Sequence, residues 1–253
     1  MNRLTTAWGT HDLTRFPEDP RDQLRAWDAA DAYLLRHLAE TGAPTGTGDG
    51  ALVVALDRWG ALTTALAAHR PVQISDSHLA RSATRANLAR AGLGDPGAAG
   101  VRLLTTRDTP PERIDVLLVR VPKSLALLED QLRRLAPALH PGTLVVGTGM
   151  VKEIHTSTLR LFERVVGPTR TSLAEQKARL IHATVARRDR PPRPQPLAAA
   201  VRAARRDRPH VRPHRHQPRR DLLRRPPRRR HPLLPRAAPG ARRARPGGRP
   251  RLR

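Results

Sequence analysis

Two kinds of hydrophobic pattern alternate along the first 167 residues of the chain. Short continuous apolar runs predict buried strands at residues 51–56, 71–75, 101–105, 114–121 and 143–149. Apolar residues at spacings of three and four predict helices at residues 24–38, 60–69, 77–93, 125–139 and 153–167. Strands separated by helices of this length pair in parallel through crossover connections. We therefore expect an α/β fold, with a mostly parallel sheet and helices on both faces.

The composition changes at about residue 187. Residues 187–253 hold 24 arginines, 14 prolines and three acidic residues, with no aromatic residue. Residues 1–186 carry 23 basic and 19 acidic groups and all six aromatic residues. A segment of low hydrophobicity and high net charge cannot bury enough surface to offset its chain entropy. We therefore predict a folded domain over 1–186 and a disordered basic tail over 187–253, and the pI of 11.9 mainly reflects that tail.

Several functional classes are disfavoured by composition. The chain has no cysteine, which excludes a disulfide framework, a thiolate metal site and a cysteine nucleophile. None of the 11 histidines pairs with a carboxylate at metal-ligand spacing, so we expect no metal site. The first residues contain no signal-peptide core, and no apolar run approaches the length of a membrane span. We expect a cytoplasmic protein that does not contact a membrane and acts as a monomer.

The carboxyl ends of the strands are where an open α/β sheet binds its ligands. The loop after the first strand of the sheet reads LDRWGAL over residues 56–62, with a single glycine. A nucleotide or adenosyl cofactor requires close approach of the backbone, which usually takes two or three glycines at this position. Arg58 and Trp59 instead place bulk in the turn, and we therefore predict no cofactor for this chain.

Two further strand ends carry residues of interest. Asp76 ends the second strand and lies where S-adenosylmethionine-dependent methyltransferases carry a ribose-binding acid, so it resembles a vestigial cofactor ligand. We favour a vestigial helix cap for Asp76 over a live ribose ligand. After the run VLLVRV, the tetrad Val121-Pro122-Lys123-Ser124 occupies the position at which amino-group methyltransferases carry Asn-Pro-Pro-Phe. The folded part thus resembles a methyltransferase-like, Rossmann-like domain that has lost its active site.

Five segments together resemble one family. They are LTRFP (13–17), LRAWDAADAYLLRHL (24–38), VPKSLALLEDQLRRL (121–135), KEIHTSTLRLFERVVGPT (152–169) and LAEQKARL (173–180). Over residues 12–184 the chain is similar to the N-terminal, degenerate methyltransferase domain of the large-subunit (23S) ribosomal RNA guanine-N2 methyltransferases. The resemblance implies ribosomal RNA as partner, and a second domain that binds S-adenosylmethionine and methylates guanine. It assigns no catalytic residue to the first domain.

The tail lacks what such a second domain requires, a glycine-rich loop and an Asn-Pro-Pro-Phe tetrad. We therefore asked what a shifted reading frame would encode, taking bases two and three of each codon with base one of the next. In that frame Gln195 to Arg208 can encode NPWPLRYELPDGT, and Leu223 to Arg236 can encode SADRLDVGTRFFL. Both strings resemble the beginning of the family's catalytic domain. We interpret 187–253 as an out-of-frame remnant of that domain.

The three lysines, Lys123, Lys152 and Lys177, all fall within the family-like segments. We interpret them as contacts to RNA phosphates, with solvated surface charge as the alternative. The resemblance implies that the chain is a member of the ribosomal RNA guanine-N2 methyltransferase family, yet in this frame it lacks the catalytic signatures. Two other functions remain open: a catalytically inactive RNA-binding module with a non-specific cationic tail, and a nonfunctional truncated product with an exposed docking face.

Overall fold

The computed structural model describes residues 3–43 and 49–186. The tail for which the sequence predicts disorder, 187–253, lies outside the described residues, so that prediction remains a prediction. The chain starts with an antiparallel pair, β1 (Arg3–Thr6) and β2 (Gly9–Asp12), followed by helix α1 (Ala29–Glu40). The rest alternates between strands and helices around one large sheet.

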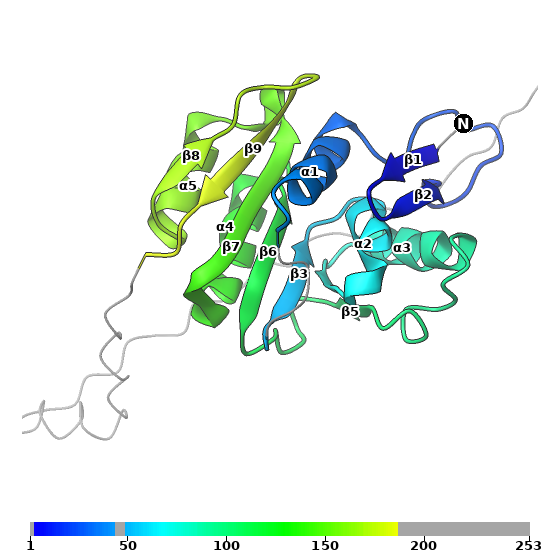
Figure 1. The fold of residues 1–253 in the computed structure, drawn as a ribbon, viewed down its shortest axis with the longest axis horizontal. Coiled ribbons are helices and arrows are strands. Elements are labelled where there is room, and N and C mark those ends of the chain that lie inside the picture. The colour runs from blue at the N-terminus through cyan, green and yellow to red at the C-terminus, as the bar shows by residue number, and fades with distance from the viewer. Residues whose placement is uncertain (1–2, 44–48, 187–253) are drawn as a thin grey trace, which may run out of the picture. The chain divides into compact units, whose positions relative to one another are not determined.

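Seven strands form that sheet in the order β5-β4-β3-β6-β7-β9-β8 (Figure 1). The strands are β3 (Ala51–Ala55), β4 (Val72–Ile74), β5 (Arg102–Leu104), β6 (Ile114–Arg120), β7 (Leu139–Met150), β8 (Thr169–Thr171) and β9 (Ala178–Ala183). The first five are parallel, whereas β9 runs antiparallel to both β7 and β8. Each strand predicted from an apolar run is present, and the expectation of a mostly parallel sheet is confirmed.

Helices cover both faces of the sheet, as predicted. They are α1, α2 (Ala61–Ala65), α3 (His78–Arg90), α4 (Leu125–Leu135) and α5 (Thr156–Val165), with short 3-10 turns at Ala67–His69, Ala136–Ala138 and Val151–Glu153. One core cluster joins α4 and α5 to the sheet and includes Leu117, Leu132 and Phe162. The other joins α1 and α2 to the opposite face and includes Leu34 and Leu118. Two apolar layers thus enclose the parallel strands.

The structure differs from the sequence prediction near both ends of the folded part, at the start of α1 and at four strands. The helix predicted at 24–38 begins only at Ala29, and Leu24, assigned to its apolar stripe, lies outside it and is 59% exposed. Asp28 fixes the start, because its side chain accepts a hydrogen bond from the Ala30 amide at 2.9 Å while Asp31 accepts one from the Asp28 amide at 3.0 Å. Strands β1, β2, β8 and β9 were not predicted, because they are short or their sequences do not form a clear apolar run.

Within residues 3–43 and 49–186, none of the helices combines the length and the hydrophobicity that crossing a lipid bilayer requires.

Candidate functional site

The turn after β3 is short and tightly packed. Asp57 is 2% exposed and accepts hydrogen bonds from the Gly60 amide at 3.1 Å and from the amide and hydroxyl of Thr63 at 2.9 and 2.8 Å. Burial raises the pKa of Asp57 above its ordinary value, although these hydrogen bonds oppose the shift. Gly60 has φ +77°, and a Cβ there would lie 2.6 Å from the Thr84 Cα. The single glycine is therefore needed for close packing against α3.

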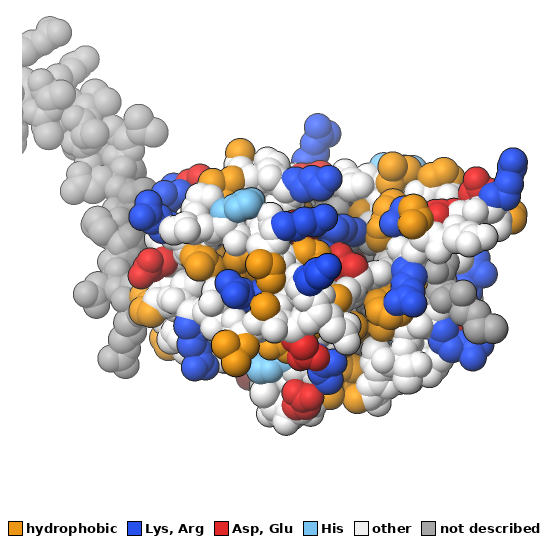
Figure 2. All heavy atoms as spheres, turned by 90° about the horizontal axis from the view of Figure 1, so that it is seen from above, with side chains coloured by type: hydrophobic (Ala, Val, Ile, Leu, Met, Phe, Trp, Pro, Cys, Tyr) orange, Lys and Arg blue, Asp and Glu red, His pale blue; other side chains and the backbone are white. Residues whose placement is uncertain are grey.

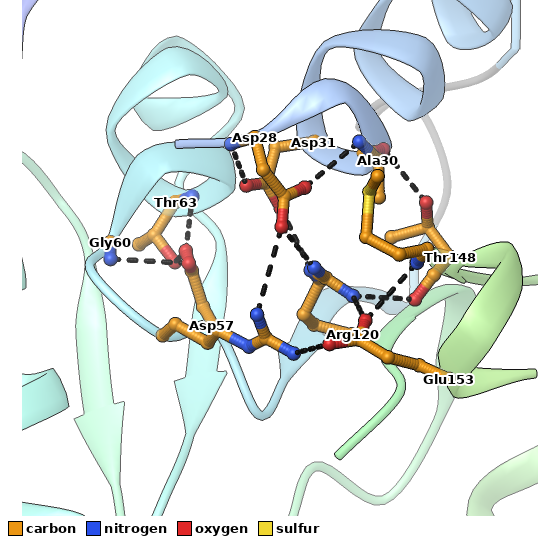
Figure 3. A network of polar contacts seen from close by, with 11 residues as sticks. Asp28, Ala30, Asp31, Asp57, Gly60, Thr63, Arg120, Thr148 and Glu153 are labelled. Atoms are coloured by element: carbon orange, nitrogen blue, oxygen red, sulfur yellow. Dashed lines mark hydrogen bonds and ion pairs between the residues drawn. The ribbon is translucent and has the colours of Figure 1, made fainter. Parts of the chain in front are cut away.

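A buried arginine at the carboxyl end of β6 organises the neighbouring charges (Figure 3). Arg120 is 1% exposed and pairs with Asp28 at 2.5 Å, Asp31 at 3.2 Å and Glu153 at 3.2 Å. Arg58, from the turn after β3, pairs with Asp28 at 3.6 Å and with Glu153 at 2.8 Å. We call these five residues the Arg120 cluster. It joins the start of α1 to the ends of β3, β6 and β7.

The charges of the Arg120 cluster nearly compensate one another. Burial raises the pKa of Asp31 to about 7, because the loss of hydration outweighs the attraction of Arg120. Burial also raises the pKa of Glu153, but the hydrogen bond from Arg58 and the nearby charges bring it below its usual value. Two arginines therefore face three carboxylates, and among these the raised pKa of Asp31 favours its neutral form. Removing the buried arginine from such a cluster would leave its carboxylates without their shared cation.

Asp76 holds a neighbouring loop in the structure. Asp76 accepts hydrogen bonds from the amide and hydroxyl of Thr106, at 2.8 to 2.9 Å, and so holds the loop after β5. The N-cap of α3 is Ser77, whose hydroxyl accepts from the Ala80 amide at 3.2 Å. The helix-cap interpretation of Asp76 is therefore wrong, because the next residue has the capping position.

Two cavities adjoin at the loop between β6 and α4. The first, which we call the apolar chamber, measures about 360 Å³ and lies beside the β3 turn and the start of α3. The second, which we call the basic chamber, measures about 350 Å³ and lies beside the start of α5. Pro122 and Lys123 line both chambers. The hollow therefore runs along the carboxyl ends of β3, β6 and β7, where open α/β sheets bind ligands.

The three predicted lysines gather near this hollow. Lys123 and Lys152 are exposed and both line the basic chamber. Lys177 does not line it, but its carbonyl accepts a hydrogen bond from the Val151 amide at 2.8 Å, which places the β8–β9 turn beside Lys152. Of the tetrad at residues 121–124, Ser124 caps α4 by accepting from the Leu127 amide at 3.2 Å.

Sequence reasoning missed the Arg120 cluster. The signal was present, because an arginine inside the apolar run of β6 indicates a buried charge that needs carboxylate partners. The partners come from residues 28, 31 and 153, and no sequence spacing relates them to position 120. In the described ranges, no group of three or more histidine, aspartate or glutamate side chains is placed to hold a metal ion.

The strand order, the antiparallel pair at one edge and the helices on both faces define a class, the S-adenosylmethionine-dependent methyltransferase fold. A solved structure of this class, the 16S rRNA N2 methyltransferase RsmC of T. thermophilus in complex with AdoMet and guanosine, is similar with a TM-score of 0.54. The two sequences are 16% identical, and the match covers 73% of this chain and 50% of that one. At this identity the likeness shows the fold.

The chain belongs to the family described as the RLMG N-terminal domain, whose model matches residues 1–187. It is 76% identical over 181 residues to the ribosomal RNA large subunit methyltransferase G of Streptomyces avermitilis. The protein of the same name from Aeromonas hydrophila is 46% identical over 181 residues. Each match covers 72% of this chain and 46% of the relative, so the chain spans about half the length of the curated relatives it matches. The family resemblance inferred from the five segments is confirmed.

Proposed function

We propose that the folded part of this chain binds ribosomal RNA at the carboxyl end of its sheet and does not itself hold S-adenosylmethionine. One observation carries the proposal. At the carboxyl end of the sheet, where this fold class binds its ligands, the exposed Lys123 and Lys152 line the basic chamber, next to the charge-compensated Arg120 cluster. Positive charge next to a cavity favours a polyanion such as RNA.

The residues present do not suit S-adenosylmethionine. That cofactor carries a sulfonium, an ammonium and a carboxylate group and is a net cation at neutral pH, whereas Lys123 and Lys152 place two further cations in the walls of these chambers. The β3 turn has one glycine, already used for packing against α3, and Trp59 adds bulk beside it. Asp76 already accepts hydrogen bonds from the amide and hydroxyl of Thr106. These features support a domain without the methyl-transfer activity that the relatives' name states.

The basic tail adds to the proposed function of the whole chain. Residues 187–253 would add sequence-independent attraction to any RNA, because 24 arginines face only three acids there. Methylation of a guanine amine with S-adenosylmethionine would then belong to the second domain of intact relatives, of which the tail is the out-of-frame remnant. We propose that the chain acts as a monomer in the cytoplasm, where its proposed partner is found.

Replacing Lys123, Lys152 and Lys177 together by alanine is expected to weaken RNA binding. Each lost phosphate contact lowers the slope of log affinity against log salt by roughly 0.7 on single strands, so the triple variant should lose about 2. The measurement is fluorescence anisotropy of a labelled single-stranded RNA across a salt series, with the full chain. The matched control replaces three exposed arginines outside the chambers, Arg21, Arg85 and Arg102. Equal slopes for the two triple variants would refute the assignment.

A further inference from the structure

The two chambers differ in chemistry although they share a wall. The apolar chamber is lined by Trp59, Leu79, Pro122 and Leu127, among others, and its leucines at 79 and 127 are 49% and 37% exposed. Exposed leucines beside an aromatic ring form a surface on which a flat apolar group can be buried. The Arg15 guanidinium lies over the Trp59 ring, 5.4 Å from its centroid. The apolar chamber is thus suited to one nucleobase, which binding proteins commonly hold against aromatic and apolar side chains.

The basic chamber has lysine ammonium groups in its wall. Lys123, Lys152 and His155 line it, and neither lysine forms an ion pair with any of the residues that the structure describes. The one carboxylate in its wall, Glu153, is engaged by Arg58 at 2.8 Å and by Arg120 at 3.2 Å. Ser157 and Thr158, from the first turn of α5, add hydroxyl groups to the lining. This set of groups is suited to a phosphate.

We propose that the two chambers together bind one nucleotide of a single-stranded RNA, with its base in the apolar chamber and its phosphate in the basic chamber. The inference rests on the proposed RNA-binding function and assigns it a place and a substrate class. Figure 2 looks onto the side towards which the arrowhead of β7 points in Figure 1. There, Lys and Arg side chains gather near the middle, with hydrophobic side chains among them.

A base-binding chamber next to a phosphate-binding chamber favours binding of an unpaired RNA strand over a duplex. In a helix the bases are stacked and paired, so a chamber can take a base only where the strand is open. Lys123 borders both chambers and therefore lies between the proposed places of base and phosphate. A site of this kind recognises base and backbone together, whereas charge alone would recognise only phosphates.

The test compares two single-stranded RNA pentanucleotides that differ only in their central residue, which is intact in one and abasic in the other. The full chain should bind the intact oligonucleotide about tenfold more tightly, because stacking of one base contributes that order of affinity. The readouts are dissociation constants by competition and quenching of tryptophan fluorescence, which Trp59→Phe should abolish. Leu79→Glu, at the mouth of the apolar chamber, should reduce the tenfold preference to none. The control is Leu93→Glu, which makes the same charge change at a leucine that is 38% exposed and lies outside both chambers. This variant should keep the tenfold preference for the intact oligonucleotide.

The outcomes separate this inference from the function on which it rests. Equal affinity of the wild-type chain for intact and abasic oligonucleotides would overturn the nucleotide site, even if the lysine variant showed that RNA binds here. A base preference that survives Leu79→Glu would overturn it too, because the base would then lie elsewhere. If the triple lysine variant matched its arginine control as well, the proposed RNA-binding function would fail with it.

Discussion

Ending the chain after residue 186 should change the slope of log RNA affinity against log salt from about −6 to −9 down to about −2. The larger slope assumes that about six to ten of the 24 tail arginines contact phosphates in addition to the three lysines, at roughly 0.7 per contact on single strands. The smaller slope corresponds to three lysine contacts on a domain with 23 basic and 19 acidic groups. Affinity at low salt should fall by several orders of magnitude, since this electrostatic contribution does not depend on sequence.

The measurement uses fluorescence anisotropy with a ribosomal RNA fragment and an unrelated RNA of equal length. The full chain should bind both alike, because counterion release from arginines does not read sequence. The control is a chain of full length in which tail arginines are replaced by glutamine, which keeps the length and removes the charge. A truncated chain that retains the full slope would show that the folded domain, and not the tail, dominates RNA binding.

Arg120→Met should lower the free energy of unfolding by about 3–5 kcal/mol at pH 8, because it leaves Asp28, Asp31 and Glu153 without their shared cation in a buried region. Methionine matches the volume of the arginine stem, so lost packing contributes little. The measurement is urea unfolding of the full chain. Arg58→Met removes a more exposed arginine from the same cluster, 37% exposed, and should cost about 1 kcal/mol or less. Equal losses for the two variants would contradict a central role for Arg120.

The loss caused by Arg120→Met should be smaller at pH 5. Burial raises the pKa of Asp31 to about 7 in the folded protein, above its value in the unfolded chain. The folded state therefore binds this proton more tightly, and stability falls as pH rises from about 4 to 7. Without Arg120 the pKa of Asp31 rises further, so at pH 5 this side chain is neutral in the variant and needs no cation. A loss that is independent of pH would contradict the assignment of Asp31 to this cluster.

The sheet was predictable because its central strands are continuous apolar runs. The apolar runs that form β3 and β6 have hydrophobic side chains on both faces of the strand, and these are buried only if helices cover both faces of the sheet. The sequence therefore predicts that these segments are strands and that helical layers enclose them. The same reasoning fails for β1 and β2, each four residues long, and for β8, three residues long. Their pairing depends on contacts with the rest of the fold rather than on their own pattern.

The candidate site was predictable only in part. The lysines at 123, 152 and 177 could be chosen because they are rare in a chain that otherwise uses arginine. The apolar chamber could not be predicted, because its walls come from residues 56–59, 75–80 and 122–127. Asp76 illustrates the limit at one residue, since its partner is Thr106, on the loop after the next strand. Local pattern predicts elements, whereas sites depend on which loops the topology brings together.

Calorimetric titration of the full chain with S-adenosylmethionine tests the central claim most directly. The central claim is that this domain has a methyltransferase fold but binds RNA instead of the cofactor. The Arg120 cluster and the lysines lie at the carboxyl end of the sheet, where the fold class binds its ligands. The account predicts no saturable heat at cofactor concentrations well above the micromolar range, and an unchanged affinity for the single-stranded RNA oligonucleotide when the cofactor is present. A saturable heat with a micromolar dissociation constant would contradict it, because Arg58, Trp59 and Lys123 would then have to accommodate a cationic cofactor.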